Sequence, residues 1–276
     1  MRRLVRTALD EDIGPGDATS LATIDPQATS SARMVARQSL VVAGIELAEM
    51  AFREVSPKVE VTRRVNDGSS AESKDALLEV AGNTRALLTA ERVSLNFVQR
   101  LSGIATLTAK YVEAVRGTRA QILDTRKTTP GLRRLEKYAV TCGGGKNHRF
   151  GLFDMVLIKD NHLAALMGER PNAIAAAVER ARLKYPDLKV EVETDTLEQV
   201  QQAVDAHADV ILLDNMSVEQ LRQAVHLVAG RAKTEASGGV TLATVRSIAE
   251  TGVDMISVGA LTHSATAVDI GLDFVS

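Results

Sequence analysis

The second part of the chain alternates short apolar runs with longer amphipathic stretches. Each run has the length and apolar character of a strand buried in a sheet, and the runs lie at residues 121–123, 155–158, 189–193, 209–213, 233–236 and 254–258. The stretches between the later runs repeat apolar residues at helical spacing, at residues 172–184, 197–206, 218–228 and 242–250. This repeated strand-and-helix unit predicts an α/β fold with parallel strands, as an open sheet or a barrel.

The first part of the chain shows a different pattern. Strand-like segments at residues 32–38, 59–65 and 77–80 precede one long helical pattern from about Thr84 to Val115. We therefore predict an N-terminal α/β domain over residues 1–103 and a barrel domain over residues 104–264. The tail, residues 265–276, is expected to return to the first domain as a strand.

Polar residues or glycines follow the predicted strands of the second part. They are Asp124 to Lys127, Lys159 to His162, Glu193, Asp214 with Asn215, Ser237 to Gly239, and Gly259. A single instance is ordinary loop chemistry. The whole set indicates a shared pocket, because the carboxyl ends of parallel strands in an α/β barrel converge on one face.

Composition argues against several classes of protein. The longest apolar stretch, residues 39–52, contains Glu46 and Glu49 and is shorter than the roughly 18 residues that a membrane helix needs. A net charge of −2 without tryptophan argues against a nucleic-acid surface, which requires a basic face with stacking rings. The single cysteine, Cys142, excludes an intrachain disulfide. The first residues lack the apolar core of a signal peptide, so we expect a cytoplasmic protein.

Positive charge nevertheless gathers between Asp124 and His162, where eight basic residues stand against four acidic residues. The basic residues are Arg126, Lys127, Arg133, Arg134, Lys137, Lys146, Arg149 and Lys159. A solvated charged face explains such a cluster. Charge alone favours this interpretation, and the alternative is a site for a small, strongly anionic ligand, because clustered cations hold an anion by charge-assisted hydrogen bonds.

Two further features suit phosphate and metal binding. Glycine-bearing turns after strands, here Ser237 to Gly239 and Gly259 with Ala260, commonly hold phosphates through backbone N–H groups. Glu193 and Asp214 end successive strands and supply the oxygen ligands that Mg2+ prefers, although ion pairs with nearby lysines explain the same carboxylates. The sequence contains neither a Walker A motif nor a GxGxxG fingerprint, which argues against a nucleotide-hydrolysing or dinucleotide-dependent enzyme.

The sequence strongly resembles the quinolinate phosphoribosyltransferases. The resemblance begins at Asp10 to Asp17 and continues to the last ten residues. Its most specific motifs are Asp124 to Gly131, Gly143 to Arg149 followed by Gly151 to Asp154, Lys159 to His162, Leu213 to Asn215, Glu235 to Gly239, and Leu261 to Ser264.

The resemblance implies a two-part fold with a shared active site. The parts are an N-terminal α/β sandwich domain and an incomplete α/β barrel, in a homodimer where the partner's N-terminal domain covers each barrel site. The positions that match the family's substrate-binding residues are Thr125, Arg126, Lys127, His148, Arg149 and Lys159, together with Arg92 of the partner subunit. The metal-binding positions match Glu193 and Asp214, and the phosphate-binding positions match Ser237, Gly238, Gly239, Val258, Gly259 and Ala260.

The activity implied by the resemblance joins quinolinate to phosphoribosyl pyrophosphate with loss of CO2, giving nicotinate mononucleotide and pyrophosphate for de novo NAD synthesis. Lys127, Lys159, Glu193 and Asp214 are then the catalytic residues, and the two carboxylates hold Mg2+. Two alternatives stay open. One is a related phosphoribosyltransferase for another small anionic acceptor, since a fold does not fix its substrate. The other is a metabolite-binding protein without activity, which the four intact catalytic side chains weigh against.

Overall fold

The computed structural model describes residues 1–275, which divide into two compact units. Unit 1 contains residues 1–109, 131–144 and the C-terminal segment from residue 265, and unit 2 contains residues 110–130 and 145–264. The boundary therefore lies inside α4 (Thr84–Ala114), a few residues beyond the predicted position. Helix α5 (Arg133–Cys142) belongs to unit 1, because its buried Glu136 accepts a hydrogen bond of 2.9 Å from Arg100 of α4.

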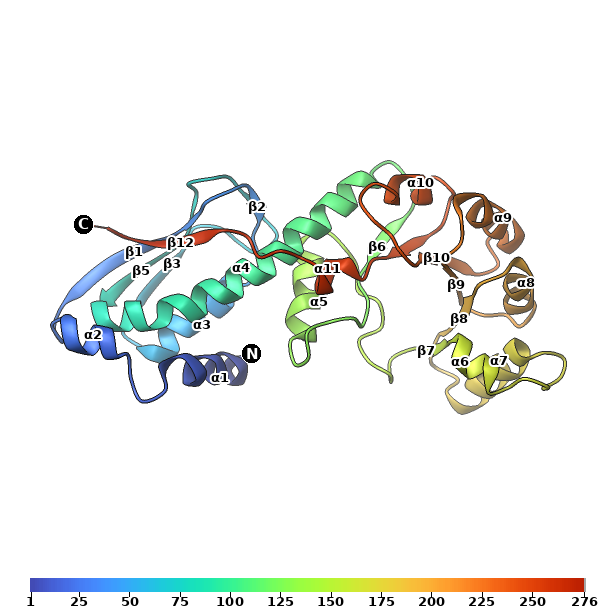
Figure 1. Cartoon of the computed structure of the whole chain (residues 1–276), viewed down its shortest axis with the longest axis horizontal. Helices are drawn as coiled ribbons and strands as arrows, with labels where there is room; N and C mark the ends of the chain where they lie inside the picture. The colour runs from blue at the N-terminus through green and yellow to red at the C-terminus, as the bar shows by residue number, and fades with distance from the viewer. Residues whose placement is uncertain (276) are drawn as a thin grey trace. The chain divides into compact units, whose positions relative to one another are not determined.

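Unit 1 is built on a four-stranded antiparallel sheet in the order β12-β1-β5-β3 (Figure 1). Its strands are β1 (Thr29–Ala36), β3 (Glu60–Arg63), β5 (Ala76–Asn83) and β12 (Ile270–Val275), and β2 (Leu40–Val41) pairs separately with β4 (Ser70–Ala71). Helix α3 (Ile45–Val55) and α4 cover one face of this sheet. Fully buried Met34, Phe52, Leu78 and Leu87 form part of the core between them.

Two short helices precede this sheet and were not predicted from the sequence. Helix α1 (Arg2–Ile13) is fixed to α3 because Glu54 accepts hydrogen bonds from both Arg2 and Arg6. Helix α2 (Ala18–Thr23) begins at Asp17, whose carboxylate accepts a hydrogen bond of 3.0 Å from the Ser20 N–H. A side-chain oxygen at this position satisfies a backbone donor that the first helical turn leaves without a partner.

Unit 2 is built on a six-stranded parallel sheet in the order β6-β11-β10-β9-β8-β7. The strands are β6 (Gln121–Leu123), β7 (Val156–Ile158), β8 (Val190–Thr194), β9 (Val210–Asp214), β10 (Lys233–Ser237) and β11 (Met255–Ser257). Each overlaps one of the predicted apolar runs. Strands β6 and β7 are the two edges, so the barrel is incomplete, which confirms the predicted fold class.

The helices of unit 2 follow its strands. They are α6 (Asp160–Ala164), α7 (Ala173–Lys184), α8 (Leu197–Asp205), α9 (Val218–Val228), α10 (Val245–Ala249) and α11 (Ala260–His263). Helices α8 and α9 each begin with a capping box, formed by Thr196 with Gln199 and by Ser217 with Gln220. These caps end the preceding loops within a few residues of the strands and thereby fix the directions of the strand ends.

Strand register brings the functional side chains into one layer. Glu193 of β8 and Glu235 of β10 both lie opposite Leu212 of β9. Since residues at the same register of neighbouring strands point to the same face of a sheet, these three side chains share the inner face. Strand pairing therefore places residues about 40 positions apart in the sequence beside one another.

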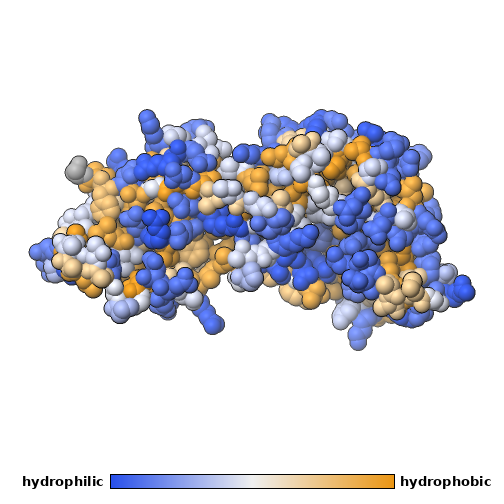
Figure 2. Space-filling model, in the orientation of Figure 1, coloured by the Kyte–Doolittle hydropathy of each residue, from blue (hydrophilic) through white to orange (hydrophobic). Residues whose placement is uncertain are grey.

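The face of the molecule seen in Figure 2 is mainly hydrophilic, with hydrophobic residues in small groups between polar ones. No helix within residues 1–275 is long and apolar enough to cross a membrane.

Candidate active site

A cavity of about 400 Å³ lies at the carboxyl ends of the strands of unit 2. We call it the carboxyl-end cavity. Its lining residues are Thr125, Arg126, Lys127, His148, Arg149, Leu157, Lys159, Glu193, Leu212, Asp214, Glu235, Ser237 and Ser257. The structure thus gathers the predicted substrate-binding residues of the barrel and both predicted metal ligands in one place, where α/β barrels hold their active sites.

The loop after β6 is held in place by internal hydrogen bonds. Buried Asp124 accepts a hydrogen bond of 2.9 Å from the backbone N–H of His148. The Thr125 hydroxyl accepts one of 3.0 Å from the Lys127 N–H, and the Thr262 hydroxyl donates one of 2.7 Å to the Lys127 carbonyl. The backbone that carries Arg126 and Lys127 is therefore preorganised, so little ordering is left for a ligand to impose.

Two guanidinium groups lie close together in the carboxyl-end cavity. Burial lowers the pKa of Arg149, and the neighbouring Arg126 guanidinium lowers it further. The Arg149 guanidinium also donates a hydrogen bond of 3.3 Å to the Met155 carbonyl, which fixes its direction. Two cations that repel each other in a partly buried site favour an anion between them, and the planar guanidinium fork matches a carboxylate.

The two predicted metal ligands have different partners. Glu193 forms an ion pair of 3.0 Å with Lys159, as the lysine-pairing alternative anticipated. Asp214 accepts a hydrogen bond of 2.6 Å from the Asn215 side chain. Both carboxylates line the cavity, so they offer hard oxygen donors of the kind that Mg2+ prefers.

The turn after β10 has a backbone that favours glycine. Gly238 and Gly239 have φ values of 94° and 57°, in the left-handed region that disfavours residues with a Cβ. A Cβ on Gly238 would also lie 2.1 Å from the Asn215 Oδ1 atom. The turn consequently packs closely against the residue after Asp214, and it places Ser237 in the cavity wall.

The second predicted phosphate turn, Val258 to Ala260, leads into helix α11. The Val258 N–H already donates a hydrogen bond of 2.9 Å to the Leu123 carbonyl, so this N–H group serves the fold. A Cβ on Gly259 would lie 3.0 Å from the His263 ring and 3.3 Å from the Lys127 side chain. This tight packing is the physical reason for glycine at this position.

Arg92 lies outside unit 2. It belongs to α4 in unit 1, where its side chain is exposed and its charge acts on the neighbouring Glu91 carboxyl.

Sequence reasoning missed the buried acids beside the carboxyl-end cavity. Glu191 and Glu235 are almost fully buried, and with His148 they form the group within residues 1–275 that has metal-ligand spacing. A signal was present in the sequence. Residues 190–193 read Val-Glu-Val-Glu, so the two carboxylates share one face of the strand and the two valines share the other.

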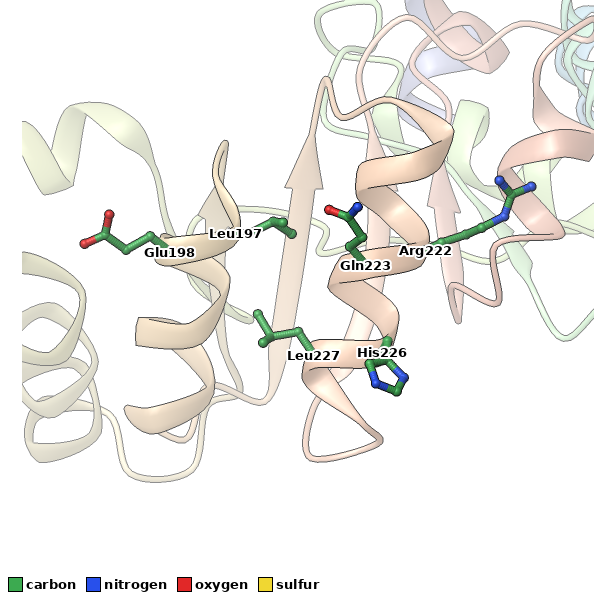
Figure 3. A pocket seen from close by; sticks show the side chains of 6 residues that line it. All are labelled: Leu197, Glu198, Arg222, Gln223, His226 and Leu227. Carbon is green, nitrogen blue, oxygen red and sulfur yellow. The ribbon is translucent and has the colours of Figure 1, made fainter.

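A larger hollow, of about 560 Å³, lies between α8 and α9 (Figure 3). Leu197, Gln223 and Leu227 point into the space between these helices, whereas Glu198 points away. No predicted site residue lines this hollow, and its lining carries little polar surface. We therefore place the candidate active site in the smaller carboxyl-end cavity, where the charged side chains converge.

An open parallel barrel with a cationic cavity at its strand ends defines the chain as an α/β-barrel enzyme for anionic substrates. Residues 17–102 match the N-terminal domain of quinolinate phosphoribosyl transferase, and residues 104–273 match its C-terminal domain. The chain therefore belongs to the quinolinate phosphoribosyltransferase family.

Individual relatives agree with this assignment. A mitochondrial quinolinate phosphoribosyltransferase [decarboxylating] of Nicotiana tabacum is 46% identical, over 99% of this chain and 81% of its own length. The nicotinate-nucleotide pyrophosphorylase [carboxylating] of Mycobacterium leprae is also 46% identical, over 99% of this chain and 96% of its own length. A solved structure of the nicotinate-nucleotide pyrophosphorylase from Francisella tularensis superposes with a TM-score of 0.93 at 39% identity, covering 99% of this chain and 95% of that one.

Proposed function

We propose that this protein transfers the phosphoribosyl group of phosphoribosyl pyrophosphate to quinolinate, with loss of CO2, to give nicotinate mononucleotide and pyrophosphate. One observation carries the proposal. A chain with a net charge of −2 gathers Arg126, Lys127, Arg149 and Lys159 in a single cavity of about 400 Å³. Both substrates are polyanions, and such a cavity suits them.

The arginines suit the acceptor. Quinolinate is a flat pyridine with two adjacent carboxylates, and a guanidinium group binds a carboxylate with two parallel hydrogen bonds. The mutual repulsion of Arg126 and Arg149 is relieved when a dianion lies between them. Thr125 and His148 also line the cavity, and His148 accepts a hydrogen bond from the Arg149 N–H.

The lysines and carboxylates suit the phosphoribosyl donor. Lys127 and Lys159 act as compact point charges for the pyrophosphate, and Ser237 to Gly239 with Val258 to Ala260 form the phosphate-binding turns. Glu193 and Asp214 would hold Mg2+, which supplies charge neutralisation at the pyrophosphate when it is bound. Lys159 forms an ion pair with Glu193. When Glu193 is displaced, Lys159 therefore becomes available to the substrates.

The reaction then proceeds by positioning and charge stabilisation. The C1–O bond to pyrophosphate breaks while the pyridine nitrogen forms the new bond to C1 of the ribose. The resulting N-glycosyl pyridinium withdraws electrons from its 2-carboxylate, the C–C bond breaks and CO2 leaves. The electron pair stays on carbon 2, and protonation of this carbon by water or a nearby acid completes the product.

We further propose that the protein works as a homodimer in which Arg92 of the partner subunit completes each site. Arg92 is exposed on α4, where its guanidinium is accessible to another molecule. A two-fold dimer would supply the residue to both sites reciprocally.

The test is turnover of quinolinate labelled with 13C in its 2-carboxylate, with phosphoribosyl pyrophosphate and Mg2+. We expect labelled CO2, pyrophosphate and nicotinate mononucleotide in equal amounts. Nicotinate is the matched control acceptor, because it lacks the 2-carboxylate and leaves a cation of the cavity without its partner. Binding of quinolinate without any product, or comparable turnover of nicotinate, would contradict the proposal.

A further inference from the structure

Three ionisable side chains from three separate segments meet at the carboxyl-end cavity, where two of them, His148 and Glu235, line the wall. The Nε2 atom of His148 lies 3.1 Å from Glu191 Oε2 and 3.5 Å from Glu235 Oε1. Their side chains are only 8%, 0% and 2% exposed, respectively. Neither oxygen of Glu191 accepts a well-aligned hydrogen bond, and nor does Glu235 Oε1. Buried carboxylates of this kind are costly unless a proton or a cation compensates them.

A backbone contact fixes where the imidazole carries its proton. The N–H group of Arg149 donates a hydrogen bond of 2.7 Å to the Nδ1 atom of His148. A backbone N–H can only donate, so Nδ1 must be the acceptor and carries no proton. The ring is therefore neutral, with its single proton on Nε2, the atom that faces the two glutamates.

This arrangement decides between two occupants of the cluster. The ligand atoms of His148, Glu191 and Glu235 lie within 4.8 Å of one another, which is close enough for a metal ion. A metal ion needs a ring nitrogen without a proton, whereas Nε2 is protonated and Nδ1 is engaged by Arg149. The cluster is consequently a site for protons.

Charge balance indicates which carboxyl holds the extra proton. Beside a neutral imidazole, two ionised carboxylates this deeply buried would repel each other. Glu191 is balanced by the Arg149 guanidinium, with which it interacts electrostatically. Burial raises the pKa of Glu235, and the neighbouring Glu191 and Asp124 charges raise it further, whereas a hydrogen bond with Ser257 lowers it.

We propose that Glu235 is a positioning residue for substrate binding. Its carboxyl group is protonated, and together with Glu191 it faces the Nε2 proton of the His148 ring and holds the ring in place. His148 Nδ1 in turn anchors the backbone of Arg149, whose guanidinium group lines the cavity. The protonated Glu235 thus determines, through His148, the position of Arg149 in the lining of the cavity.

The consequence for quinolinate rests on the proposed function, whereas the proton arrangement is independent of it. If Glu235 is truncated, the His148 ring keeps Glu191 but loses its second acidic neighbour, and its hold on the Arg149 backbone weakens. The affinity for a dicarboxylate should then fall, with little change in the chemical step, since the interaction acts on binding of the substrate.

The first experiment reads the protons directly. Protein labelled with 15N in the histidine rings is studied by two-dimensional NMR, and the His148 signals among the five histidines are assigned with a His148→Gln variant. We expect the neutral Nε2–H form at neutral pH, without added substrate or metal. A proton on Nδ1, protons on both nitrogens, or bound metal in stoichiometric amount that chelation removes would each overturn the proposal.

The second experiment compares substitutions at position 235. Glu235→Ala should raise the KM for quinolinate about tenfold and change kcat by less than about threefold. Glu235→Gln replaces a neutral carboxyl with a neutral amide and should recover most of this loss, with the Nε2–H signal retained. If the Gln variant is as impaired as the Ala variant, Glu235 acts as a charge and the proposal fails.

Thr234→Ala is the matched control. Thr234 precedes Glu235 on β10, is also buried, and faces the opposite side of the sheet, where its hydroxyl donates to Asp254 at 3.0 Å. This variant should lose stability while its KM for quinolinate and its His148 signals stay as in the wild-type protein. A wild-type protein that makes no nicotinate mononucleotide would contradict the proposed function only, because the NMR measurement still decides the proton arrangement.

Discussion

The two ends of the parallel sheet in unit 2 carry cavities of nearly equal size and opposite electrostatic design. The carboxyl-end cavity has a volume of about 400 Å³, and a cavity of about 380 Å³ lies where the strands begin. We call the latter the amino-end cavity. It is lined by Arg119, His207, Ala208, Asp209, Val225, Val228, Gly230, Arg231, Ala232, Lys233, Thr234 and Asp254.

Charges at the amino end are used internally. Asp254 accepts hydrogen bonds from the Thr234 N–H and from Lys233, at 3.0 and 2.9 Å. Asp209 accepts from the Val190 N–H at 2.8 Å and from Arg182 at 3.1 Å. At the carboxyl end Lys159 also pairs with Glu193, but Arg126 and Arg149 lie close enough to repel each other. The similar volumes of the two cavities therefore say little about function. The informative difference is how far the charged side chains of each cavity are paired with one another.

The largest effects should follow from removing a cation at the carboxyl end. We expect Arg126→Ala and Arg149→Ala each to raise the KM for quinolinate about 100-fold, which corresponds to about 3 kcal/mol for a lost charge-assisted contact. Asp214→Ala should instead mainly lower kcat, since metal positioning acts on the leaving group. Steady-state kinetics and calorimetry measure the two effects.

Arg119→Ala, at the amino end, is the control for these variants and should leave the KM for quinolinate unchanged. Normal quinolinate affinity in both carboxyl-end variants would show that the repulsion between the two arginines has no connection with the substrate.

The next effect tests whether the carboxyl end is completed by a second subunit. Arg92→Ala and Arg126→Ala proteins should each be nearly inactive. In a mixed dimer, one site carries both substitutions and the other carries none, so random exchange should restore about a quarter of all sites. If mixed dimers are shown to form and no activity returns, Arg92 does not act across an interface.

A substitution at the amino end should affect stability alone. Asp254→Ala removes acceptors from the Thr234 N–H and hydroxyl groups, and we expect a loss of about 2 kcal/mol in the free energy of unfolding. Burial acts to raise the pKa of Asp254, but hydrogen bonds from Thr234 and Lys233 outweigh it and lower the pKa. This contribution is therefore present at neutral pH and disappears as the pH falls below the ordinary value of 3.8. Urea unfolding at neutral and acidic pH measures it.

The smallest expected effect is a pH dependence of the free energy of unfolding that comes from Glu235 at the carboxyl end. Its sign is opposite to that of the Asp254 contribution. Because the pKa of Glu235 is raised above its ordinary value of 4.5, the stability that its protonated form contributes is complete below that pH and is lost as the pH rises. The wild-type protein should lose stability relative to Glu235→Gln by at most about 1.4 kcal/mol per pH unit. Parallel pH dependences in urea unfolding above pH 4.5 would contradict a protonated Glu235.

Sequence patterns were sufficient to locate the strands and the convergence of their ends. Each apolar run of the barrel became a strand because no long polar stretch interrupts it. The charged residues that follow these parallel strands then meet, because the strand ends lie on one face of the barrel. Helix α5 shows the limit: its own sequence does not reveal that Glu136 will pack against Arg100, so its membership of unit 1 was not predictable.

The environment of His148 shows a second limit. The sequence identified this residue as a substrate contact; in the structure it lines the carboxyl-end cavity, and both of its ring nitrogens also face protein atoms. That outcome depends on Glu191 and Glu235, which lie on strands separated by β9. A contact between strands that are not adjacent in the chain is set by the order and register of the sheet, and no local pattern encodes it.

The pairing of β12 with β1 has a consequence for the way the protein is synthesised. Residues Ser31 to Ala36 pair with Val275 to Ile270, so one strand of the N-terminal sheet is translated only after every residue of unit 2. Until then, the nascent chain exposes one side of β1 as an unpaired strand edge that can recruit a neighbouring polypeptide. A ribosome that stops short of residue 270 therefore releases a protein whose defect lies at its beginning.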